Sequence, residues 1–161
     1  MGIDKSSLRE KIVSLLQAEL SLQTNAAQLA RDEATHEESR AESKYDTHSQ
    51  EAAYLAEGQA KLAGEIHAGI TLYNSLNLPP FDAADRIALG AVIELRAKER
   101  STWYFLGPRG GGLEVNADGK KILVLTPSSP LGRQLLGRRV GDVVFPPARG
   151  TPLPHRIESL T

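Results

Sequence analysis

The chain has 161 residues, of which 40% are hydrophobic and 24% charged, and this composition indicates one or two small folded domains rather than a disordered chain. It contains no cysteine, which excludes disulfide bonds and thiol catalysis, and no apolar run approaches the roughly 20 residues that span a bilayer. We therefore expect a cytoplasmic protein with no membrane segment.

The charge is divided along the chain, although the total is only -1. Residues 1–78 carry about -5 and residues 79–161 about +4. A molecule with an acidic part and a basic part can be oriented by a large charged partner.

Two heptad repeats predict a helical hairpin in residues 1–78. The first repeat consists of Leu8, Leu15, Leu22 and Leu29, and the second of Leu55, Leu62, Gly69 and Leu76. Repeats on both sides of a break indicate two antiparallel helices packed as a coiled coil. The first helix is expected to run from an Asp4 cap to about residue 35, and the second from Asp46 or Thr47 to Asn77, before two prolines.

The hydrophobic stripes of these helices are expected to be buried between them. They comprise Ile12, Leu15, Leu22, Ala26 and Leu29 on the first helix, and Ala52, Leu55, Leu62, Ile66, Tyr73 and Leu76 on the second. Gly58, Gly64 and Gly69 interrupt the second helix, and each costs about 1 kcal/mol relative to alanine. They either allow close helix contact or soften the hairpin.

An acidic cluster lies near residues 36–47, where the hairpin should reverse direction. Glu38, Glu42 and Asp46 are spaced four apart, so they would share a face if the turn were helical. Carboxylates crowded together repel one another and favour a bound cation or a cationic partner. The alternative is that they are solvated charges that keep the tip soluble.

Residues 79–161 predict a second domain of class α+β, an antiparallel sheet with one short helix. The expected strands are 87–95, 101–106, 121–126, 140–145 and 155–160, with a turn at Asp118-Gly119. Ser129 and Pro130 should cap and begin a short helix that ends before Gly137.

The stretch from Ser129-Pro-Leu-Gly to Val-Gly-Asp142 closely resembles the C-terminal signature of the Gre-type bacterial transcription elongation factors. Gly90-Ala-Val and the Trp103-Tyr-Phe-Leu-Gly107 segment fit the same pattern. The resemblance covers nearly the whole chain. It implies a coiled-coil hairpin over residues 1–78 and an FKBP-like domain, like that of FK506-binding proteins, over residues 79–161.

In that family the hairpin enters the secondary channel of RNA polymerase, and tip carboxylates help to hold a second Mg²⁺ for cleavage of backtracked RNA. The resemblance therefore implies a monomeric accessory factor that completes the polymerase active site and touches the nascent RNA only indirectly. It implies no tightly bound cofactor, and Mg²⁺ only in the polymerase complex. The implied catalytic residues are Glu38, Glu42 and Asp46, with Glu38 and Glu42 as Mg²⁺ ligands, and the implied partner-binding residues are Lys44, Tyr45, Arg133, Arg138 and Arg139.

The tip departs from the usual family pattern, which is Asp-Leu-x-Glu-Asn followed by Glu-Tyr. With Tyr45 placed on that tyrosine, Glu38 falls on the aspartate, but Ala41 falls on the glutamate and Glu42 is one place away. This departure favours a second interpretation, a regulator that docks in the channel without stimulating cleavage. Two others are a prolyl isomerase, from the FKBP-like fold alone, and a plain coiled-coil adaptor or dimer.

Overall fold

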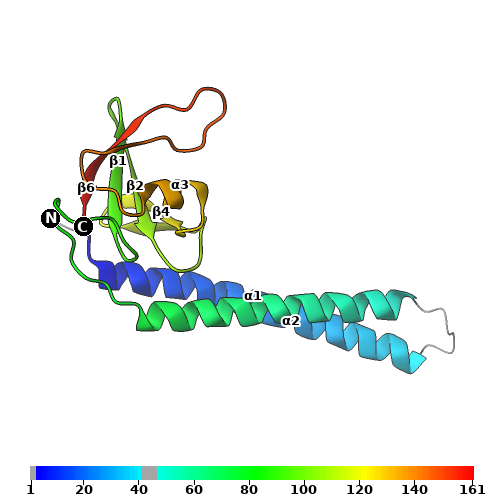
Figure 1. The fold of residues 1–161 in the computed structure, drawn as a ribbon. Coiled ribbons are helices and arrows are strands. Elements are labelled where there is room, and N and C mark those ends of the chain that lie inside the picture. Colours follow the sequence, from blue (N-terminus) through cyan, green and yellow to red (C-terminus); the bar gives the residue numbers. More distant parts are fainter. Residues whose placement is uncertain (1–2, 41–46) are drawn as a thin grey trace. The chain divides into compact units, whose positions relative to one another are not determined.

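The structure is a computed structural model that describes the backbone of residues 3–40 and 47–161, and the side chains within these ranges except 34–40, 47–49 and 52. In chain order (Figure 1) its elements are α1 (Lys5–Arg40), α2 (Thr47–Ser75), β1 (Val92–Ala97), β2 (Arg100–Leu106), β3 (Glu114–Ala117), β4 (Lys120–Leu125), α3 (Pro130–Leu135), β5 (Val143–Val144) and β6 (His155–Leu160). The expected fold class is confirmed, because two long helices packed as a hairpin precede a six-stranded sheet with one short helix.

Two predicted caps explain where helices begin. The Asp4 carboxylate accepts hydrogen bonds from the backbone N–H groups of Ser6 and Ser7, at 3.0 and 3.2 Å, and so satisfies two of the free donors of the first turn of α1. Ser129 plays the same part for α3, where its hydroxyl accepts from the Gly132 N–H at 3.1 Å. Both local sequence patterns therefore specify the starts of these helices correctly.

The sheet is mixed rather than wholly antiparallel. Its strand order is β3-β4-β2-β1-β6-β5, and β2 and β4 run parallel, with Trp103 opposite Ile122. The reason is the unexpected strand β3, which forms a hairpin with β4 through Asp118 and Gly119 and takes the outer edge. The β3–β4 hairpin reverses the chain once more, so β4 runs beside β2 in the same direction as β2.

The predicted buried stripes of the hairpin are wrong for most of its leucines. Leu22 and Leu29 are 64% and 70% exposed, whereas Ala27 is only 4% exposed. Leu15, Leu55 and Leu62 are also exposed, and the buried positions include Ala30, Ala56, Ile70 and Tyr73. Small side chains allow two helices to approach closely, so a mostly alanine seam lies between the helices and leaves the neighbouring leucine positions outside.

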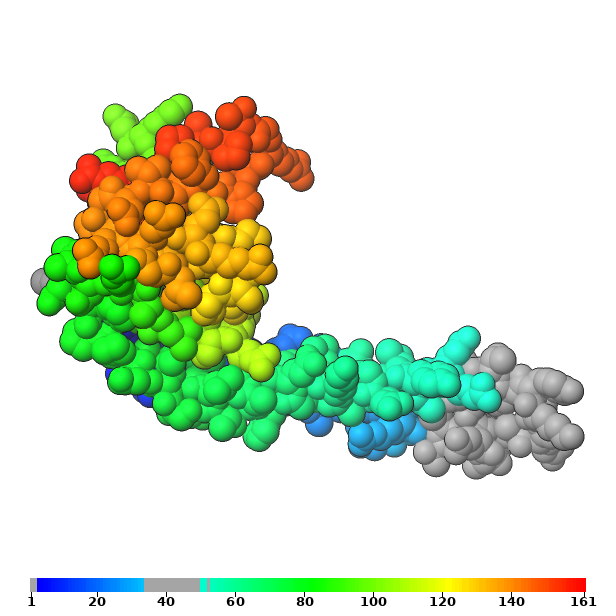
Figure 2. All heavy atoms as spheres, viewed as in Figure 1, coloured from blue at the N-terminus to red at the C-terminus, as the bar shows by residue number. Residues whose placement is uncertain are grey.

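The chain divides into two compact units, each defined by its own packing. Met1–Val13 and Leu72–Thr161 form the sheet unit, and Ser14–Thr71 form the hairpin unit. In Figure 2, α2 (green to cyan) lies in front of α1 (blue). The expected domain boundary after residue 78 falls inside the sheet unit, and as a boundary between independently folding domains it stays a prediction.

The glycines of α2 do not all serve close packing. A Cβ atom added at Gly58 or Gly64 would have no atom within 4 Å, so the close-contact explanation is wrong for these two residues. Gly69, in contrast, is buried. Gly58 and Gly64 are exposed helical glycines that contribute only backbone freedom to the unfolded chain.

We predict that Gly58→Ala and Gly64→Ala each stabilise the hairpin unit by about 1 kcal/mol, because alanine restricts the unfolded chain and fits the open space. Thermal unfolding followed by circular dichroism at 222 nm measures the effect. Gly107→Ala is the contrasting control and should destabilise, since its Cβ would overlap the Tyr73 hydroxyl. Unchanged or lower stability in both hairpin variants would contradict the prediction.

Candidate functional site

The acidic tip segment lies between the two long helices. α1 ends at Arg40 and α2 begins at Thr47, so residues 41–46 connect the ends of the antiparallel pair. Glu38 belongs to the last turns of α1. Its side chain, together with Glu42, Lys44, Tyr45 and Asp46, lies outside the described residues, so the roles assigned to these five residues stay predictions.

The hairpin unit carries a negative field along its length. Residues 14–71 have a net charge of about -6 by sequence, and Asp32, Glu51, Glu57 and Glu65 are exposed on its helices. Among the side chains that the structure describes, no three acidic, histidine or cysteine groups gather as a metal site would require. The described acids therefore give a diffuse negative surface.

Tyr73 anchors the end of α2 in the sheet unit. The side chain is fully buried and its ring lies 6.4 Å from that of Phe105, centroid to centroid. Its hydroxyl donates a hydrogen bond to the Arg109 carbonyl, and burial raises the pKa of this hydroxyl above its usual value of 10. The Tyr73 hydroxyl occupies the space that a Cβ atom at position 107 would fill, so the position requires glycine.

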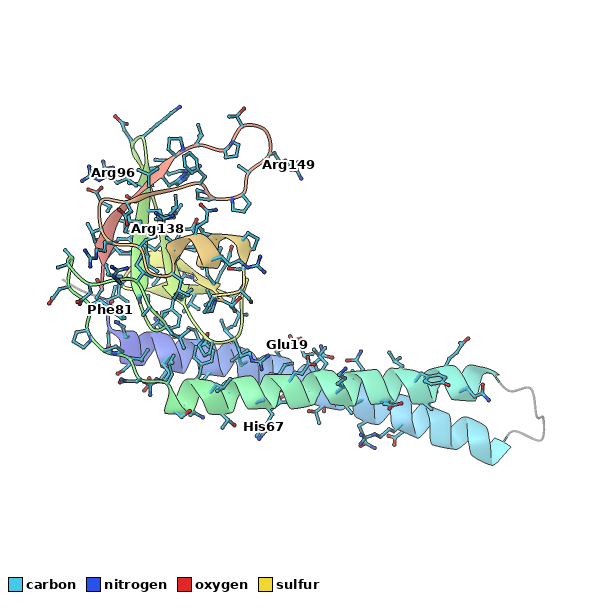
Figure 3. The ribbon with its side chains drawn as sticks, in the orientation of Figure 1. Glu19, His67, Phe81, Arg96, Arg138 and Arg149 are labelled. Atoms are coloured by element: carbon cyan, nitrogen blue, oxygen red, sulfur yellow. The ribbon has the colours of Figure 1, made fainter. Side chains whose placement is uncertain are left out.

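Lys5 anchors the beginning of α1. Its ammonium donates to the carbonyls of Pro79 and Gly90, at 2.7 and 2.9 Å, and lies 4.6 Å from the centre of the Phe81 ring. Burial lowers the pKa of Lys5 to about 8. This one cation therefore joins the start of α1 to the chain that follows α2, and Figure 3 labels Phe81 at that junction.

The three predicted partner-binding arginines lie around the end of α3. Arg133, Arg138 and Arg139 are exposed. The Arg138 Nε donates to the Gln134 carbonyl at 3.2 Å, and the Arg139 N–H donates to Asp142 Oδ2 at 2.9 Å. The structure thus brings them to one region of the sheet unit, whereas Arg149 lies apart from Arg138, on the loop before β6 (Figure 3).

The sequence alone did not identify the exposed apolar side chains that lie close to these arginines in the chain. The Gln134 amide donates to the Phe145 carbonyl at 2.7 Å and accepts from the Phe145 N–H at 2.8 Å. This double hydrogen bond fixes the Phe145 backbone while its ring stays 51% exposed. Leu136 and Val143 are exposed nearby in the chain. The alternation Val143-Val144-Phe145 predicts two outward apolar side chains, but nothing in the sequence identifies Gln134 as their support.

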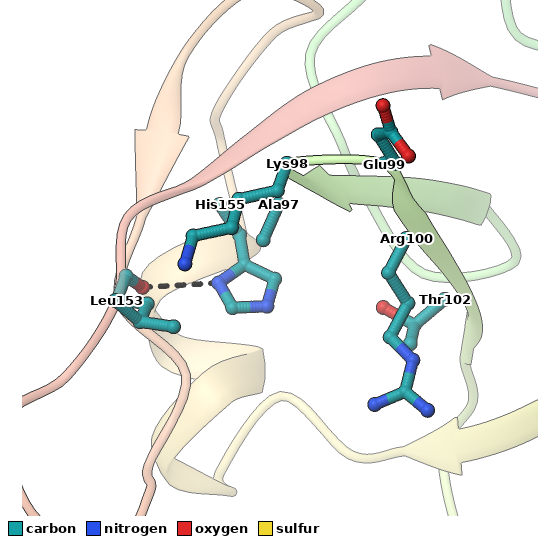
Figure 4. A pocket seen from close by; sticks show the side chains of 7 residues that line it. All are labelled: Ala97, Lys98, Glu99, Arg100, Thr102, Leu153 and His155. Carbon is teal, nitrogen blue, oxygen red and sulfur yellow. Dashed lines mark hydrogen bonds between the residues drawn. The ribbon is translucent and has the colours of Figure 1, made fainter.

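A pocket of about 530 Å³ lies at the turn between β1 and β2 (Figure 4). It is lined by Ala97, Lys98, Glu99, Arg100, Thr102, Leu153 and His155. The His155 ring is held by a 3.0 Å hydrogen bond to the Leu153 carbonyl. The lining has no phenylalanine, tyrosine or tryptophan, so this pocket lacks the aromatic walls that the prolyl isomerase interpretation requires.

Comparison with known proteins gives a structural likeness only. No family model and no curated protein matches the chain. Solved structures of Gfh1, a GreA factor homolog, match over more than nine-tenths of the chain. The Thermus thermophilus structure is 18% identical, with a TM-score of 0.39, and covers 92% of this chain and 94% of that one. The Thermus aquaticus Gfh1 structure is 19% identical, with a TM-score of 0.39, over 91% and 92% of the two chains.

A transcription elongation factor GreA/GreB from Nitrosomonas europaea is 19% identical, with a TM-score of 0.38, and covers 70% of this chain and 92% of that chain. Identities and TM-scores this low do not determine a function for this chain. Neither long helix, within the part of the chain that the structure describes, has the apolar stretch needed to cross a membrane.

We predict that the half-buried Lys5 makes stability rise with pH between about 8 and 9.5. The unfolded chain keeps the usual lysine pKa of 10.5, so in this range it binds more protons than the folded chain, whose Lys5 pKa is about 8. Relative to Lys5→Met, the wild-type free energy of unfolding should increase by about 1 kcal/mol, after allowance for screening of a half-buried cation. Urea unfolding at pH 7.5 and 9.5 measures it, and parallel pH profiles would contradict it.

Proposed function

We propose that this protein binds RNA polymerase and inserts its helical hairpin into the secondary channel, so that the acidic tip meets the polymerase catalytic centre. The observation that carries the proposal is the pair of long antiparallel helices that ends in the acidic segment 36–47. At about 1.5 Å per residue, the 29 residues of α2 extend about 45 Å, which suits a probe into a deep cavity. The residue-level resemblance over Ser129–Asp142 supports the same partner.

Within this proposal the tip stimulates cleavage of backtracked RNA. Carboxylate oxygens are the ligands that Mg²⁺ prefers, and Mg²⁺ bound beside a scissile phosphate neutralises its charge and activates water. Glu38 and Glu42 would supply such oxygens, with Asp46 close by in sequence. The protein alone would then have no active site, because the polymerase provides the remaining ligands and the RNA.

A second candidate keeps the docking and omits the cleavage. Ala41 stands where the usual family tip has a glutamate, so the tip lacks one carboxylate at that position. A docked hairpin without the full set of ligands would still fill the channel and exclude other molecules from it. Such a protein would act as a regulator of initiation or as an inhibitor.

In this proposal the sheet unit contacts the polymerase through the surface that carries Arg133, Arg138 and Arg139. Arg133, Arg138 and Arg139 are exposed near the end of α3, and Gln134 in the same stretch holds the exposed Phe145. Cations and an apolar side chain are thus close in the chain, and interfaces commonly combine an apolar middle with a polar rim. A cationic rim speeds association with an acidic surface and selects against basic ones. The face therefore fits an acidic patch on the polymerase.

We predict that Glu38→Ala with Glu42→Ala lowers RNA cleavage in stalled polymerase complexes by at least about 100-fold, since even outer-shell partners of a metal are worth 10–100-fold. The measurement is transcript shortening in backtracked complexes at several Mg²⁺ concentrations. Glu51→Ala with Glu57→Ala is the matched control, because it removes the same charge from exposed positions on α2.

Full cleavage activity in the Glu38/Glu42 double variant would remove these residues from the mechanism. If the wild-type protein binds polymerase and shortens no transcript, the second candidate replaces the first. If it binds no polymerase in a pull-down with the core enzyme, both candidate functions are wrong, and the result favours the coiled-coil adaptor instead.

We predict that Arg138→Glu with Arg139→Glu weakens polymerase binding by about 10-fold or more at 100 mM salt, mainly through slower association. Arg100→Glu with Arg149→Glu makes the same charge change at two other exposed positions, at the start of β2 and on the loop before β6, and should have little effect. Surface-immobilised polymerase and a salt series measure both rates. Equal losses in the two double variants would show that net charge, and not this face, controls binding.

A further inference from the structure

Three cationic side chains, Arg156, Arg96 and Lys120, lie in a row across one face of the sheet. Arg96 on β1 pairs directly with Arg156 on β6 and with Ser101 on β2. Side chains of directly paired residues point to the same face, so the two arginines lie side by side. Both are exposed, and in Figure 3 the Arg96 side chain points away from the sheet.

The two arginines repel each other, and a bound anion would relieve this repulsion. Like charges directly opposite on neighbouring strands destabilise a sheet. Neither arginine forms a salt bridge with any side chain that the structure describes, and Arg96 makes only a long 3.4 Å contact from Nε to the Lys98 carbonyl. Glu94 is the acid nearest to Arg96 along this face of β1, and it accepts a hydrogen bond from the Ser159 hydroxyl at 3.0 Å.

The row continues to an aromatic ring on the same face. Trp103 lies two residues beyond Ser101 on β2, and its β4 partner is Ile122, two residues beyond Lys120. Trp103 and Lys120 therefore share the face, and the Lys120 ammonium lies 5.0 Å from the centre of the Trp103 ring. Three cations and one tryptophan thus occupy four neighbouring strands, β6, β1, β2 and β4.

A pocket opens beside this ring. The pairing of β2 with β4 begins only at Trp103 and Ile122, so the strand ends before these residues are not paired with each other. The space there, about 560 Å³, is lined from both faces of the strands. Ser101, Trp103 and Lys120 belong to the face of the arginines, and the other side chains of the lining belong to the opposite face: Arg100, Thr102, Tyr104, Lys121 and Leu123. Lys121 is paired with Glu114 at 3.0 Å, and both are exposed, which makes this a weak pair.

We propose that this face of the sheet unit binds a segment of single-stranded nucleic acid. Arg96, Arg156 and Lys120 contact successive phosphates, and a base stacks on the Trp103 ring after the Lys120 ammonium moves from the ring to a phosphate. Cations that follow a backbone beside an aromatic stacking surface are the general means of binding single strands. The tryptophan favours this ligand over an acidic protein, which needs no stacking surface.

Trp103 also provides the assay, since it is the only tryptophan in the chain. Titration of the full-length protein with a uridine octamer at 50 mM salt should quench its fluorescence. A labelled octamer in fluorescence anisotropy gives the affinity and its dependence on salt. An abasic octamer of the same charge should bind about 10-fold more weakly, because each stacked base is worth about 1–3 kcal/mol.

The variants separate charge from stacking. Arg96→Gln with Arg156→Gln should reduce affinity about 10-fold and reduce the slope of log affinity against log salt by about 1.4, at about 0.7 per phosphate contact on a single strand. Trp103→Leu, followed by anisotropy, should remove the preference for the uridine octamer over the abasic one. Arg86→Gln with Lys61→Gln is the matched control, with both residues exposed outside this face.

Several results would overturn the proposal. These are absence of quenching, equal binding of the uridine and abasic octamers, equal binding of an octaglutamate peptide, or an affinity that the arginine variants leave unchanged. Circular dichroism melting of each variant establishes that it is folded. The assay contains no polymerase, so its outcome is independent of the proposed function.

Discussion

The sheet unit depends on the way in which the first residues of α1 and the last residues of α2 pack within it. Tyr73 places a full aromatic side chain in the core, and its hydroxyl donates a hydrogen bond to the Arg109 carbonyl. An unpaired buried hydroxyl would cost roughly 1–3 kcal/mol, so ring and hydrogen bond have to form together. Gly107 makes this possible by leaving space for the hydroxyl. At the start of α1, the half-buried ammonium of Lys5 donates hydrogen bonds to two carbonyl oxygens and lies over an aromatic ring.

Sequence reasoning succeeded where a single local rule controls the structure. The Asp4 and Ser129 caps, the Asp118-Gly119 turn and the strand at 155–160 each follow from residues within a few positions of one another. It failed at the helix seam, because a seven-residue leucine repeat identifies a helix without showing which of two adjacent stripes faces the partner. Alanines at Ala27, Ala30 and Ala56 occupy the interior, and their closeness to each other is a tertiary property. The parallel pairing of β2 with β4 was missed for a similar reason, since it depends on the short strand β3, whose residues carry little strand preference.

The candidate sites were predictable to different degrees. The arginines at 133, 138 and 139 were found from sequence because three cations in seven residues at a helix end are visible in one dimension. The support that Gln134 gives to Phe145 was not visible, because it joins an amide side chain to a backbone eleven residues away. The Arg96–Arg156 pair is further apart still and exists only through the register of β1 and β6. The acidic tip was identified by composition, while the placement of its carboxylates depends on residues beyond the described part of the chain.

The alanine seam between the two helices lowers the cooperativity with which the whole chain unfolds. Among the described side chains of the hairpin unit, the buried apolar ones are small, apart from Leu16 and Ile70, so little of their hydrophobic area holds the two helices together. The sheet unit, in contrast, buries a continuous core that includes Ile93, Leu106 and Ile157. The free energy that opens the helices around Ala27 and Ala56 is therefore smaller than the free energy that melts the sheet. Heating should produce two transitions rather than one, and amide protons in the middle of α1 should exchange with solvent sooner than those of β1.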